Sequence, residues 1–454
     1  MKGSLSVFRD RSFLRKLRMI ALPIVVQNLL NFGVSAADTI MVGQLGEVQL
    51  SAVAVSSQMT FLYMISTFGV AAGCGVLAAQ HWGAGNKEKV REIIAFMFRI
   101  MAAVSLGFAA VAFLIPHHVL GFIIDDPEVI AEGVRYLRVL SVGYLFFGTT
   151  TAGLVILRST GTVKIAMLIS LCSLVISVVL NYLLIFGNFG FPTLGVVGAA
   201  TATSIAWGVG VILLVIYLFK VEKNVAFRPR YLLRRGEGIA KSFGRFATPV
   251  LFNEIGWGAA NFMLGVIVGR MGREFVAANS IGQLVVQFVG VVIFGVAGAS
   301  AAIMGNTIGA GEKEKAKQYA NGMLILSLGL GVVSFFVVQG VRLPLIGLYE
   351  ISDTARIYAE QITHVISGNM IFLSIAAVAI IGTLRGGGDT KFAALVDIIF
   401  VWLVAIPLGA FTGLRLGWPV WAVYIILRSE DVFKSVLILW RIRSGKWIKD
   451  VTKK

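Results

Sequence analysis

Three carboxylate side chains lie inside long apolar stretches of the sequence, where a charge is expensive. Asp38 lies in SAADTIMVG, Glu254 follows Pro249 by five residues, and Asp397 lies in a third apolar stretch. Ionisable groups at membrane depth are usually functional, because an ionised side chain in hydrocarbon costs free energy. Such a carboxylate can exchange a proton, bind Na⁺ or hold the positive end of an organic cation. We expect this function for Asp38 and Glu254, whereas for Asp397 a structural role explains the sequence equally well.

Hydroxyl and amide side chains interrupt two further apolar stretches. Ser177 and Asn181 are one helical turn apart and would share one face of a helix. Thr201, Thr203 and Ser204 lie near the start of the next stretch. Their oxygen atoms suit a hard cation such as Na⁺. Hydrogen bonding between neighbouring helices accounts for the same residues equally well.

The composition places these side chains in a membrane. The chain has 454 residues, of which 57% are hydrophobic and only 14% are charged, and its mean hydropathy is +0.86. A helix needs about 20 mostly apolar residues to cross a bilayer, and the sequence has twelve such stretches. We predict an all-α integral membrane protein, since helices satisfy their own backbone hydrogen bonds in lipid. The stretches are 18–42, 52–79, 93–115, 134–157, 163–187, 195–219, 246–269, 276–304, 320–343, 360–383, 392–413 and 418–441.

The basic residues give the predicted orientation. Most of the 40 Lys and Arg residues lie in the two tails and in the loops that follow every second stretch. Under the positive-inside rule, the chain is a multi-pass protein of the cytoplasmic (inner) membrane with both termini in the cytoplasm. The net charge of +17 is then mostly a topology signal rather than evidence for nucleic-acid binding. The basic segment 220–245 separates an N-lobe (1–219) from a C-lobe (246–454).

Several other functions lack their sequence signals. Cys74 and Cys172 lie in apolar stretches without CxxC spacing, and the four histidines are scattered, so we expect no disulfide framework, zinc site or cofactor. The segments GAGNKEK and LRGGGDTK do not fit a phosphate-binding P-loop. We therefore expect glycine turns there, and we do not expect an enzyme, because catalytic groupings of His, Ser or Cys are missing.

The two halves of the sequence repeat each other. FGVAAGCGVLAAQHWGAGNKEK at 68–89 resembles FGVAGASAAIMGNTIGAGEKEK at 294–315, and LRSTGTVKIA at 157–166 resembles LRGGGDTKFA at 384–393. Each half has six predicted helices, so the copies are related by an axis along the membrane normal. Parallel repeats of this kind occur in secondary transporters, whose binding sites lie near mid-membrane.

The repeat also shows where the halves differ. Asp38 aligns with Leu264, and Glu254 aligns with Asn28. Asp397 aligns with Ser170. Because a residue that serves only packing would tend to be similar in both copies, we infer that the two lobes carry different chemistry. A further cluster, Arg428, Glu430, Asp431 and Lys434, is interpreted as structural, with Glu430 and Lys434 neutralising each other across one helical turn.

The sequence resembles the multidrug and toxic compound extrusion (MATE) family. The resemblance rests on ALPIVVQNLL with ADTIMVGQLG, on the repeated GAG and LR turns, and on VLNYLLIFG followed by GVVGAATATSIA. It implies twelve helices in two six-helix bundles around a V-shaped cavity. It also implies a monomeric antiporter that exports amphiphilic, often cationic, compounds in exchange for Na⁺ or H⁺.

The resemblance also assigns roles to individual residues. Asp38 matches the family's aspartate implicated in ion coupling, Asn181 matches an asparagine of its sodium-coupled NorM-like branch, and Glu254 matches that branch's glutamate. Asp38 and Asn181 are accordingly the residues predicted to hold Na⁺. The chain departs from the branch at Ser374, where an acidic residue is expected, and at Ser177, where an asparagine is expected.

Two other functions compete with this one. A flippase for lipid-linked oligosaccharides or lipids, from the same superfamily, would need a basic cavity for pyrophosphate, whereas the central charges here are acidic. A membrane receptor or channel would not need duplicated halves with different buried carboxylates. An antiporter that works by alternating access therefore fits the sequence better than either.

Overall fold

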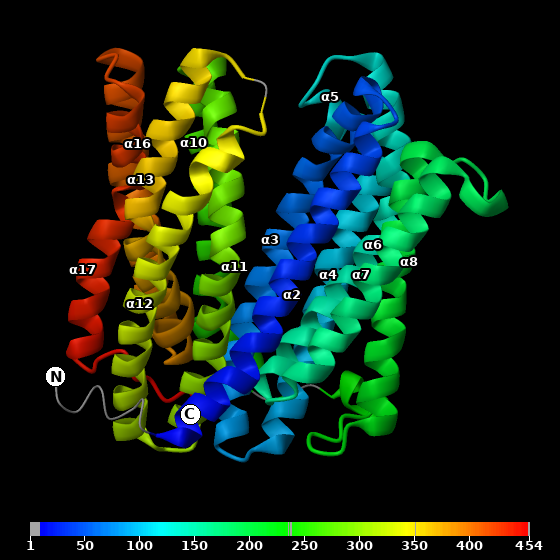
Figure 1. The fold of residues 1–454 in the computed structure, drawn as a ribbon. Helices are drawn as coiled ribbons and strands as arrows, with labels where there is room; N and C mark the ends of the chain where they lie inside the picture. Colours follow the sequence, from blue (N-terminus) through cyan, green and yellow to red (C-terminus); the bar gives the residue numbers. More distant parts are fainter. Residues whose placement is uncertain (1–9, 235, 237, 350, 453–454) are drawn as a thin grey trace. The chain divides into compact units, whose positions relative to one another are not determined.

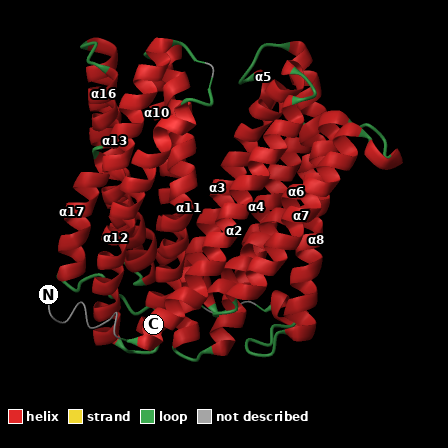
Figure 2. Ribbon diagram, viewed as in Figure 1, coloured by secondary structure: helices red, strands yellow, loops and turns green. Residues whose placement is uncertain are grey.

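The structure is a computed structural model that describes residues 10–234, 236, 238–349 and 351–452. The described part of the chain contains helices and no strands (Figure 2). Eleven helices are long and apolar enough to cross a membrane. In hydrocarbon, only a helix or a closed barrel satisfies every backbone hydrogen-bonding group. The prediction of an all-α integral membrane protein is confirmed.

Six long helices occupy the first half of the chain (Figure 1). Their bounds are α2 Arg11–Gly43, α3 Glu47–Gly83, α4 Lys87–Leu114, α6 Pro127–Ser159, α7 Val163–Phe186 and α8 Gly195–Ile216. The short helix α5 is Pro116–Gly121, and the basic linker contains α9, Ile239–Ser242. These positions agree with the six apolar stretches predicted for this half.

The second half begins with four long helices, which are α10 Thr248–Arg270, α11 Arg273–Gly309, α12 Lys313–Ile346 and α13 Asp353–Ala377. A π-helical segment, Val378–Leu384, continues α13. The next span combines α14 (Thr390–Phe400) and α15 (Ile406–Ala410) with intervening π-helical turns and reaches Arg415. Figure 1 shows α10, α11, α12, α13 and α16 (Val420–Arg428) running side by side.

The twelfth predicted stretch, 418–441, forms two helices instead of one. They are α16 and α17 (Glu430–Arg443), and Ser429 lies between them. Charged side chains flank this junction, because Arg428 ends α16 while Glu430 and Asp431 begin α17. Since α16 has 9 residues and α17 has 14, neither is long enough to be among the eleven spans.

The repeated turns have the backbone conformation that glycine permits. Gly85 and Gly311, at matching positions of the two GAG turns, have φ of +73° and +80°. Gly161 and Gly388, in the two LR turns, have φ of +83° and +82°. A residue with a Cβ atom rarely adopts these values. The interpretation of both motifs as tight turns is therefore sound for the described residues.

Contacts divide the chain into two compact units. The C-terminal unit comprises the described residues before Val26, the segment Ala79–Gly85 and the residues from Thr248 onward. The N-terminal unit comprises Val26–Ala78 and Asn86–Ala247. The divisions fall inside α2 and α3, whereas the predicted lobes 1–219 and 246–454 follow the sequence repeat.

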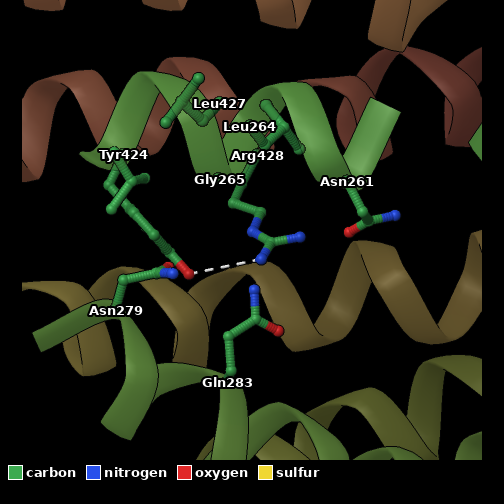
Figure 3. Close-up of a pocket in the computed structure, with 9 residues that line it drawn as sticks. Asn261, Leu264, Gly265, Asn279, Gln283, Tyr424, Leu427 and Arg428 are labelled. Atoms are coloured by element: carbon green, nitrogen blue, oxygen red, sulfur yellow. Dashed lines mark hydrogen bonds between the residues drawn. The ribbon is translucent and has the colours of Figure 1, made fainter. Parts of the chain in front are cut away.

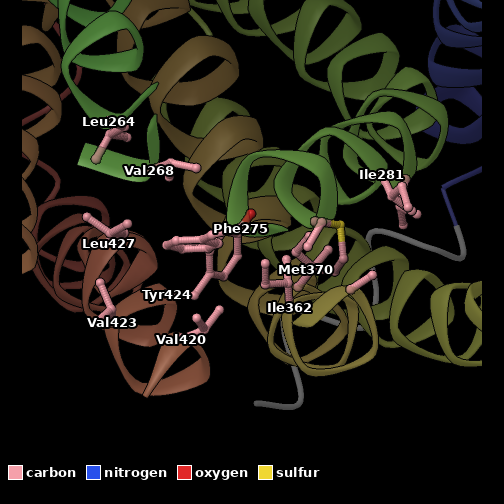
Figure 4. Packing of buried hydrophobic residues seen from close by; sticks show 14 of the residues in the cluster. Leu264, Val268, Phe275, Ile281, Ile362, Met370, Val420, Val423, Tyr424 and Leu427 are labelled. Carbon is pink, nitrogen blue, oxygen red and sulfur yellow. The ribbon is translucent and has the colours of Figure 1, made fainter. Parts of the chain in front are cut away.

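Each unit has its own apolar core. In the C-terminal unit, Phe275 of α11 packs with Ile362 and Met370 of α13 and with Val423 and Tyr424 of α16 (Figure 4). In the N-terminal unit, Tyr63 of α3 and Tyr144 of α6 are both fully buried, and their ring centroids lie 4.5 Å apart. Tyr63 also hydrogen-bonds to Ser105 of α4 at 2.9 Å. Dense packing of this kind fixes the helices that carry the polar groups described below.

A buried carboxylate fastens the C-terminal tail to the C-terminal unit. Asp389 is fully buried and pairs with Arg441 at 2.7 Å and with Lys449 at 2.5 Å. Gln80, at the end of α3, accepts a hydrogen bond from the Val451 N–H at 2.9 Å. The Gln80 amide also donates to the Lys449 carbonyl at 3.2 Å. The tail and the end of α3 thus form one hydrogen-bonded cluster.

Asp389→Asn should destabilise this unit, because it leaves Arg441 and Lys449 without their shared carboxylate. Breaking a fully buried ion pair costs about 3–5 kcal/mol. Lys449 is 43% exposed, so we expect a smaller loss of about 2 kcal/mol, seen as a lower melting temperature of the purified protein. Glu314→Gln is the control, since the carboxylate of Glu314 is 81% exposed. Equal melting of the Asp389→Asn variant and the wild type would contradict the role of this cluster.

Candidate functional site

Asp38 and Asn181 meet inside the N-terminal unit, where α2 passes α7. The Asn181 amide donates a hydrogen bond to Asp38 Oδ1 at 2.5 Å. Asn181 is 1% exposed, and its Oδ1 has no hydrogen-bond partner among the described residues. In the same part of the chain, no ion pair reaches Asp38. A carboxylate and an amide oxygen that has no hydrogen-bond partner among the described residues therefore belong to neighbouring side chains.

The other predicted N-lobe residues lie on α2, α7 and α8. Ser177 is 6% exposed and lies one turn before Asn181 on α7. Thr203 is half-buried on α8, and among the described residues no hydrogen bond joins it to Asp38 or Asn181. Asn28 lies ten residues before Asp38 on α2, which is about 15 Å along a helix axis. Asn28 therefore does not belong to the Asp38 site.

A second polar junction in the N-terminal unit joins α2, α6 and α7. The Arg158 guanidinium donates a hydrogen bond to Gln27 Oε1, and the Gln27 amide donates to the Ser170 hydroxyl. Gln27 is 4% exposed. All of the contacts that the structure gives this junction are to neutral groups, so the Arg158 charge is held by hydrogen bonds alone.

The C-terminal unit repeats this junction with carboxylates. The Asn253 amide donates to Asp397 at 2.9 Å, and the Arg385 guanidinium donates to Glu254 at 2.6 Å. The Arg385 side chain is 5% exposed, and that of Glu254 is 14% exposed.

The residues of the two junctions correspond in the sequence repeat. Asn253 matches Gln27, Arg385 matches Arg158, and Asp397 matches Ser170. Both halves keep the hydrogen bond from the amide to its partner, Ser170 or Asp397, but the arginine binds Gln27 in one half and Glu254 in the other.

Lys434 links this junction to α17. Its ammonium group is 3% exposed and lies 2.7 Å from Asp397 and 2.8 Å from Glu430. Asp431, next in the chain, accepts a hydrogen bond from the Asn369 amide of α13 at 2.8 Å. Lys434 therefore occupies a position between carboxylates that a bound cation could otherwise take.

The predicted pair of Glu430 and Lys434 is present, but the sequence analysis separated this cluster from Asp397. The structure joins them in one network. Asn253 and Arg385 also connect Glu254 to this network. The carboxyl groups of this network outnumber its cations, Arg385 and Lys434. At membrane depth such an excess of acid favours binding of protons or of a positively charged group.

The sequence analysis missed the two arginines. Arg158 and Arg385 occupy matching positions in LRSTG and LRGGG, segments whose pattern predicts a turn and gives the arginines no separate role. The signal that could have revealed them is a basic residue repeated in both halves beside an apolar stretch. Ser374 is neutral, as expected from the sequence, and its hydroxyl donates to the Ser327 carbonyl at 2.8 Å.

A metal cluster is not visible among the residues that the structure describes. No group of three or more His, Cys, Asp or Glu side chains is placed to hold a metal ion. The oxygens of Asp38, Asn181 and Ser177 nevertheless fit the preference of Na⁺ for hard ligands.

Comparison with known proteins gives matches along the whole chain. The sequence pattern of the MatE family matches residues 23–183 and 249–411. An uncharacterised transporter of Bacillus subtilis, YisQ, is 25% identical over 97% of this chain and 96% of its own length. A probable multidrug resistance protein NorM of Thermotoga maritima is 26% identical over 96% of this chain and 93% of its own length.

The fold is also found in solved structures. The crystal structure of an aspartate-to-asparagine mutant of the Vibrio cholerae MATE transporter VcmN has a TM-score of 0.89. It covers 100% of both chains at 16% sequence identity. An outward-facing multidrug resistance MATE family transporter has a TM-score of 0.87 at 18% identity, covering 95% of this chain and 96% of its own.

The ion pair of Glu254 with Arg385 should behave as a coupled unit. Glu254→Gln should lower the stability of the purified protein by about 3 kcal/mol, because the buried guanidinium loses its carboxylate. The double variant Glu254→Gln with Arg385→Gln should cost less than the two single variants added together. A double-mutant cycle of thermal melting measures this coupling.

Glu132→Gln is the matched control for that cycle. It removes a carboxylate whose partner, Arg135, is 67% exposed, so its effect should stay within about 0.5 kcal/mol. Simple additivity of the Glu254 and Arg385 variants would show that the two side chains are not coupled.

Proposed function

Since the chain belongs to the MATE family of transporters, we propose that it is a secondary antiporter. It exports amphiphilic, often cationic, organic compounds in exchange for Na⁺ or H⁺. Its likeness to NorM proteins supports a transport protein of the NorM-like branch rather than an enzyme. The proposal includes that the protein is a monomer in the cytoplasmic membrane. It also includes that both termini lie in the cytoplasm, which the distribution of basic residues supports.

A contrast between two aspartate–asparagine pairs carries the proposal. In the C-terminal unit, Asp397 accepts a hydrogen bond from Asn253 and also pairs with the Lys434 ammonium. In the N-terminal unit, Asp38 accepts a hydrogen bond from Asn181, and no lysine or arginine pairs with it among the described residues. The Asp38 pair thus offers to a mobile ion the place that Lys434 fills in the other unit.

The chemistry of the Asp38 pair suits either coupling ion. A proton would bind the carboxylate directly, whereas Na⁺ would take oxygens from Asp38, Asn181 and the neighbouring Ser177. Binding of either ion removes a net negative charge from the interior of the N-terminal unit. In the antiporter that we propose, this change favours one arrangement of α2 over the other.

The acidic network of the C-terminal unit supports the proposal that the exported compound is an organic cation. Glu254, Asp397, Glu430 and Asp431 supply more negative charge than Arg385 and Lys434 balance. A positively charged substrate group or a coupling cation would reduce this imbalance. Alternating access, in which the two halves rock around the bound ligand, then moves the compound across the membrane.

Asp38→Asn should abolish coupled export while leaving the fold intact, because asparagine keeps the size of the side chain and removes its charge. The measurement is efflux of a fluorescent organic cation from proteoliposomes, driven first by a Na⁺ gradient and then by a pH gradient. We expect one gradient to drive efflux by the wild type, and neither to drive efflux by the variant above the level of protein-free vesicles.

Asp125→Asn is the control for this assay, since Asp125 is exposed in a loop. It should transport like the wild type. Wild-type efflux by Asp38→Asn at equal protein content would refute the role assigned to Asp38. Failure of both gradients to drive the wild type would refute ion-coupled export itself.

A further inference from the structure

Three arginine side chains surround one tyrosine in the N-terminal unit, where the basic linker packs against α4. The guanidinium carbons of Arg91, Arg230 and Arg234 lie 5.3, 5.4 and 5.4 Å from the centre of the Tyr231 ring. Arg91 belongs to α4, and the other side chains belong to or adjoin the 3₁₀ helix Pro229–Leu233. A hydrogen bond from Arg230, helped by the charges of all three arginines, holds the pKa of the Tyr231 phenol below its usual value. Three like charges, which repel each other, are thus held around a single ring.

Hydrogen bonds hold this arrangement in place. The Arg91 Nε–H donates to the Val225 carbonyl at 2.6 Å, and its Nη1 donates to the Tyr231 hydroxyl at 3.4 Å. The Glu222 carboxylate accepts hydrogen bonds from the backbone N–H groups of residues 224–226 at 2.7–2.8 Å, which fixes the linker just before the cluster. The arginines are therefore brought together by the fold of the linker and not by a carboxylate between them.

The positive charge of this cluster exceeds the acid that pairs with it. Among the described residues, the one carboxylate that pairs with the three arginines is Glu88, which lies 3.3 Å from Arg234. Both side chains of that pair are more than half exposed, so the pair contributes little. Glu92, one turn further along α4, pairs with Lys89 instead, at 2.8 Å.

An arginine beside a tyrosine in the C-terminal unit is balanced differently. Figure 3 shows Arg428 donating to the Tyr424 hydroxyl in a cavity between α10, α11 and α16. The carboxylates of Glu430 and Asp431, in the acidic network, act on this guanidinium. In the cluster around Tyr231, an anion from outside the chain would supply the balance.

The cluster lies at the end of an apolar span, at the level where lipid headgroups begin. The last turns of that span, Tyr217–Val221, carry the exposed side chain of Phe219. The Phe219 ring stacks on Phe227 with 6.4 Å between centroids, and the Phe227 ring lies 5.9 Å from that of Tyr231. Leu233, in the same 3₁₀ helix as Tyr231, is also exposed. Exposed apolar side chains beside clustered arginines suit the boundary between hydrocarbon and headgroups.

We propose that Arg91, Arg230 and Arg234 bind the phosphate group of an anionic phospholipid. Planar guanidiniums donate paired hydrogen bonds to phosphate oxygens. The acyl chains would lie against Phe219 and continue along α8 into the bilayer. A headgroup with a net negative charge, such as that of phosphatidylglycerol, balances the cluster better than a zwitterionic one. The inference goes beyond the proposed function, because it concerns a bound lipid and neither the exported compound nor the coupling ion.

Lipid binding to the purified full-length protein tests this inference without any transport. Isothermal titration in a neutral detergent compares short-chain phosphatidylglycerol with short-chain phosphatidylcholine, which has the same phosphate but no net charge. Inorganic phosphate and hexaglutamate are the probes for a soluble anion and for an acidic protein segment. We expect phosphatidylglycerol to bind the wild type about tenfold more tightly than phosphatidylcholine. Neither soluble probe should displace it at equal concentration.

Variants of the two exposed arginines test the site itself. Arg230→Gln and Arg234→Gln should each weaken phosphatidylglycerol binding about fivefold, or about 1 kcal/mol, since each removes one charge near the headgroup. Arg234→Lys should weaken it less, because it keeps the charge and loses only the planar fork. Lys317→Gln is the matched control, because Lys317 is the counterpart of Arg91 in the repeat and pairs with Glu314. It removes the same charge from the protein and should bind phosphatidylglycerol like the wild type.

Three results would overturn the proposal. One is equal binding of the two lipids, and another is wild-type affinity for phosphatidylglycerol in both glutamine variants, Arg230→Gln and Arg234→Gln. The third is displacement of phosphatidylglycerol by inorganic phosphate or by hexaglutamate at equal concentration, which would assign the cluster to a soluble anion or to an acidic protein segment. None of these outcomes depends on ion-coupled export, so the two proposals can fail separately.

Discussion

A charge inside an apolar helix bundle has to be balanced where it lies, because hydrocarbon supplies neither water nor counterions. The C-terminal unit meets this requirement with ion pairs. Arg385 pairs with Glu254, and Lys434 of α17 pairs with Asp397. The N-terminal unit meets it for Arg158 with neutral hydrogen bonds. Asp38 differs from these groups, because no lysine or arginine pairs with it among the described residues. The proposed ion site is therefore a place where this balance is left to a ligand.

The duplicated sequence shows how such differences arise on one scaffold. The junction of Arg158, Gln27 and Ser170 has its counterpart in the second half at Arg385, with Asn253 and Asp397. The turns beside these side chains correspond in the two halves, down to the positive φ of the turn glycines, whereas only the second half has π-helical segments before and after its turn. Replacing a serine by an aspartate then requires a cation nearby, and Lys434 provides it.

Much of this fold could be predicted from the sequence, because bilayer thickness and backbone hydrogen bonding leave few choices for a chain this apolar. The asymmetry of Asp38 and Glu254 could also be predicted, since the repeat register compares equivalent positions directly. The network around Lys434 could not, because its members come from four separate helices and only the fold brings them together. The part of Asn28, the counterpart of Glu254, in ion or substrate binding stays a prediction, although its place ten residues before Asp38 on α2 keeps it away from that carboxylate.

The central claim is that movement of an organic cation is exchanged for movement of a small one. The direct test reverses the driving force. Proteoliposomes are loaded with the organic cation alone, and uptake of ²²Na⁺ or of protons is followed as the compound leaves, with no gradient of either ion at the start. The account predicts that efflux of the compound drives uptake of one of these ions and that Asp38→Asn abolishes this uptake. Efflux of the compound without movement of Na⁺ or protons would contradict it.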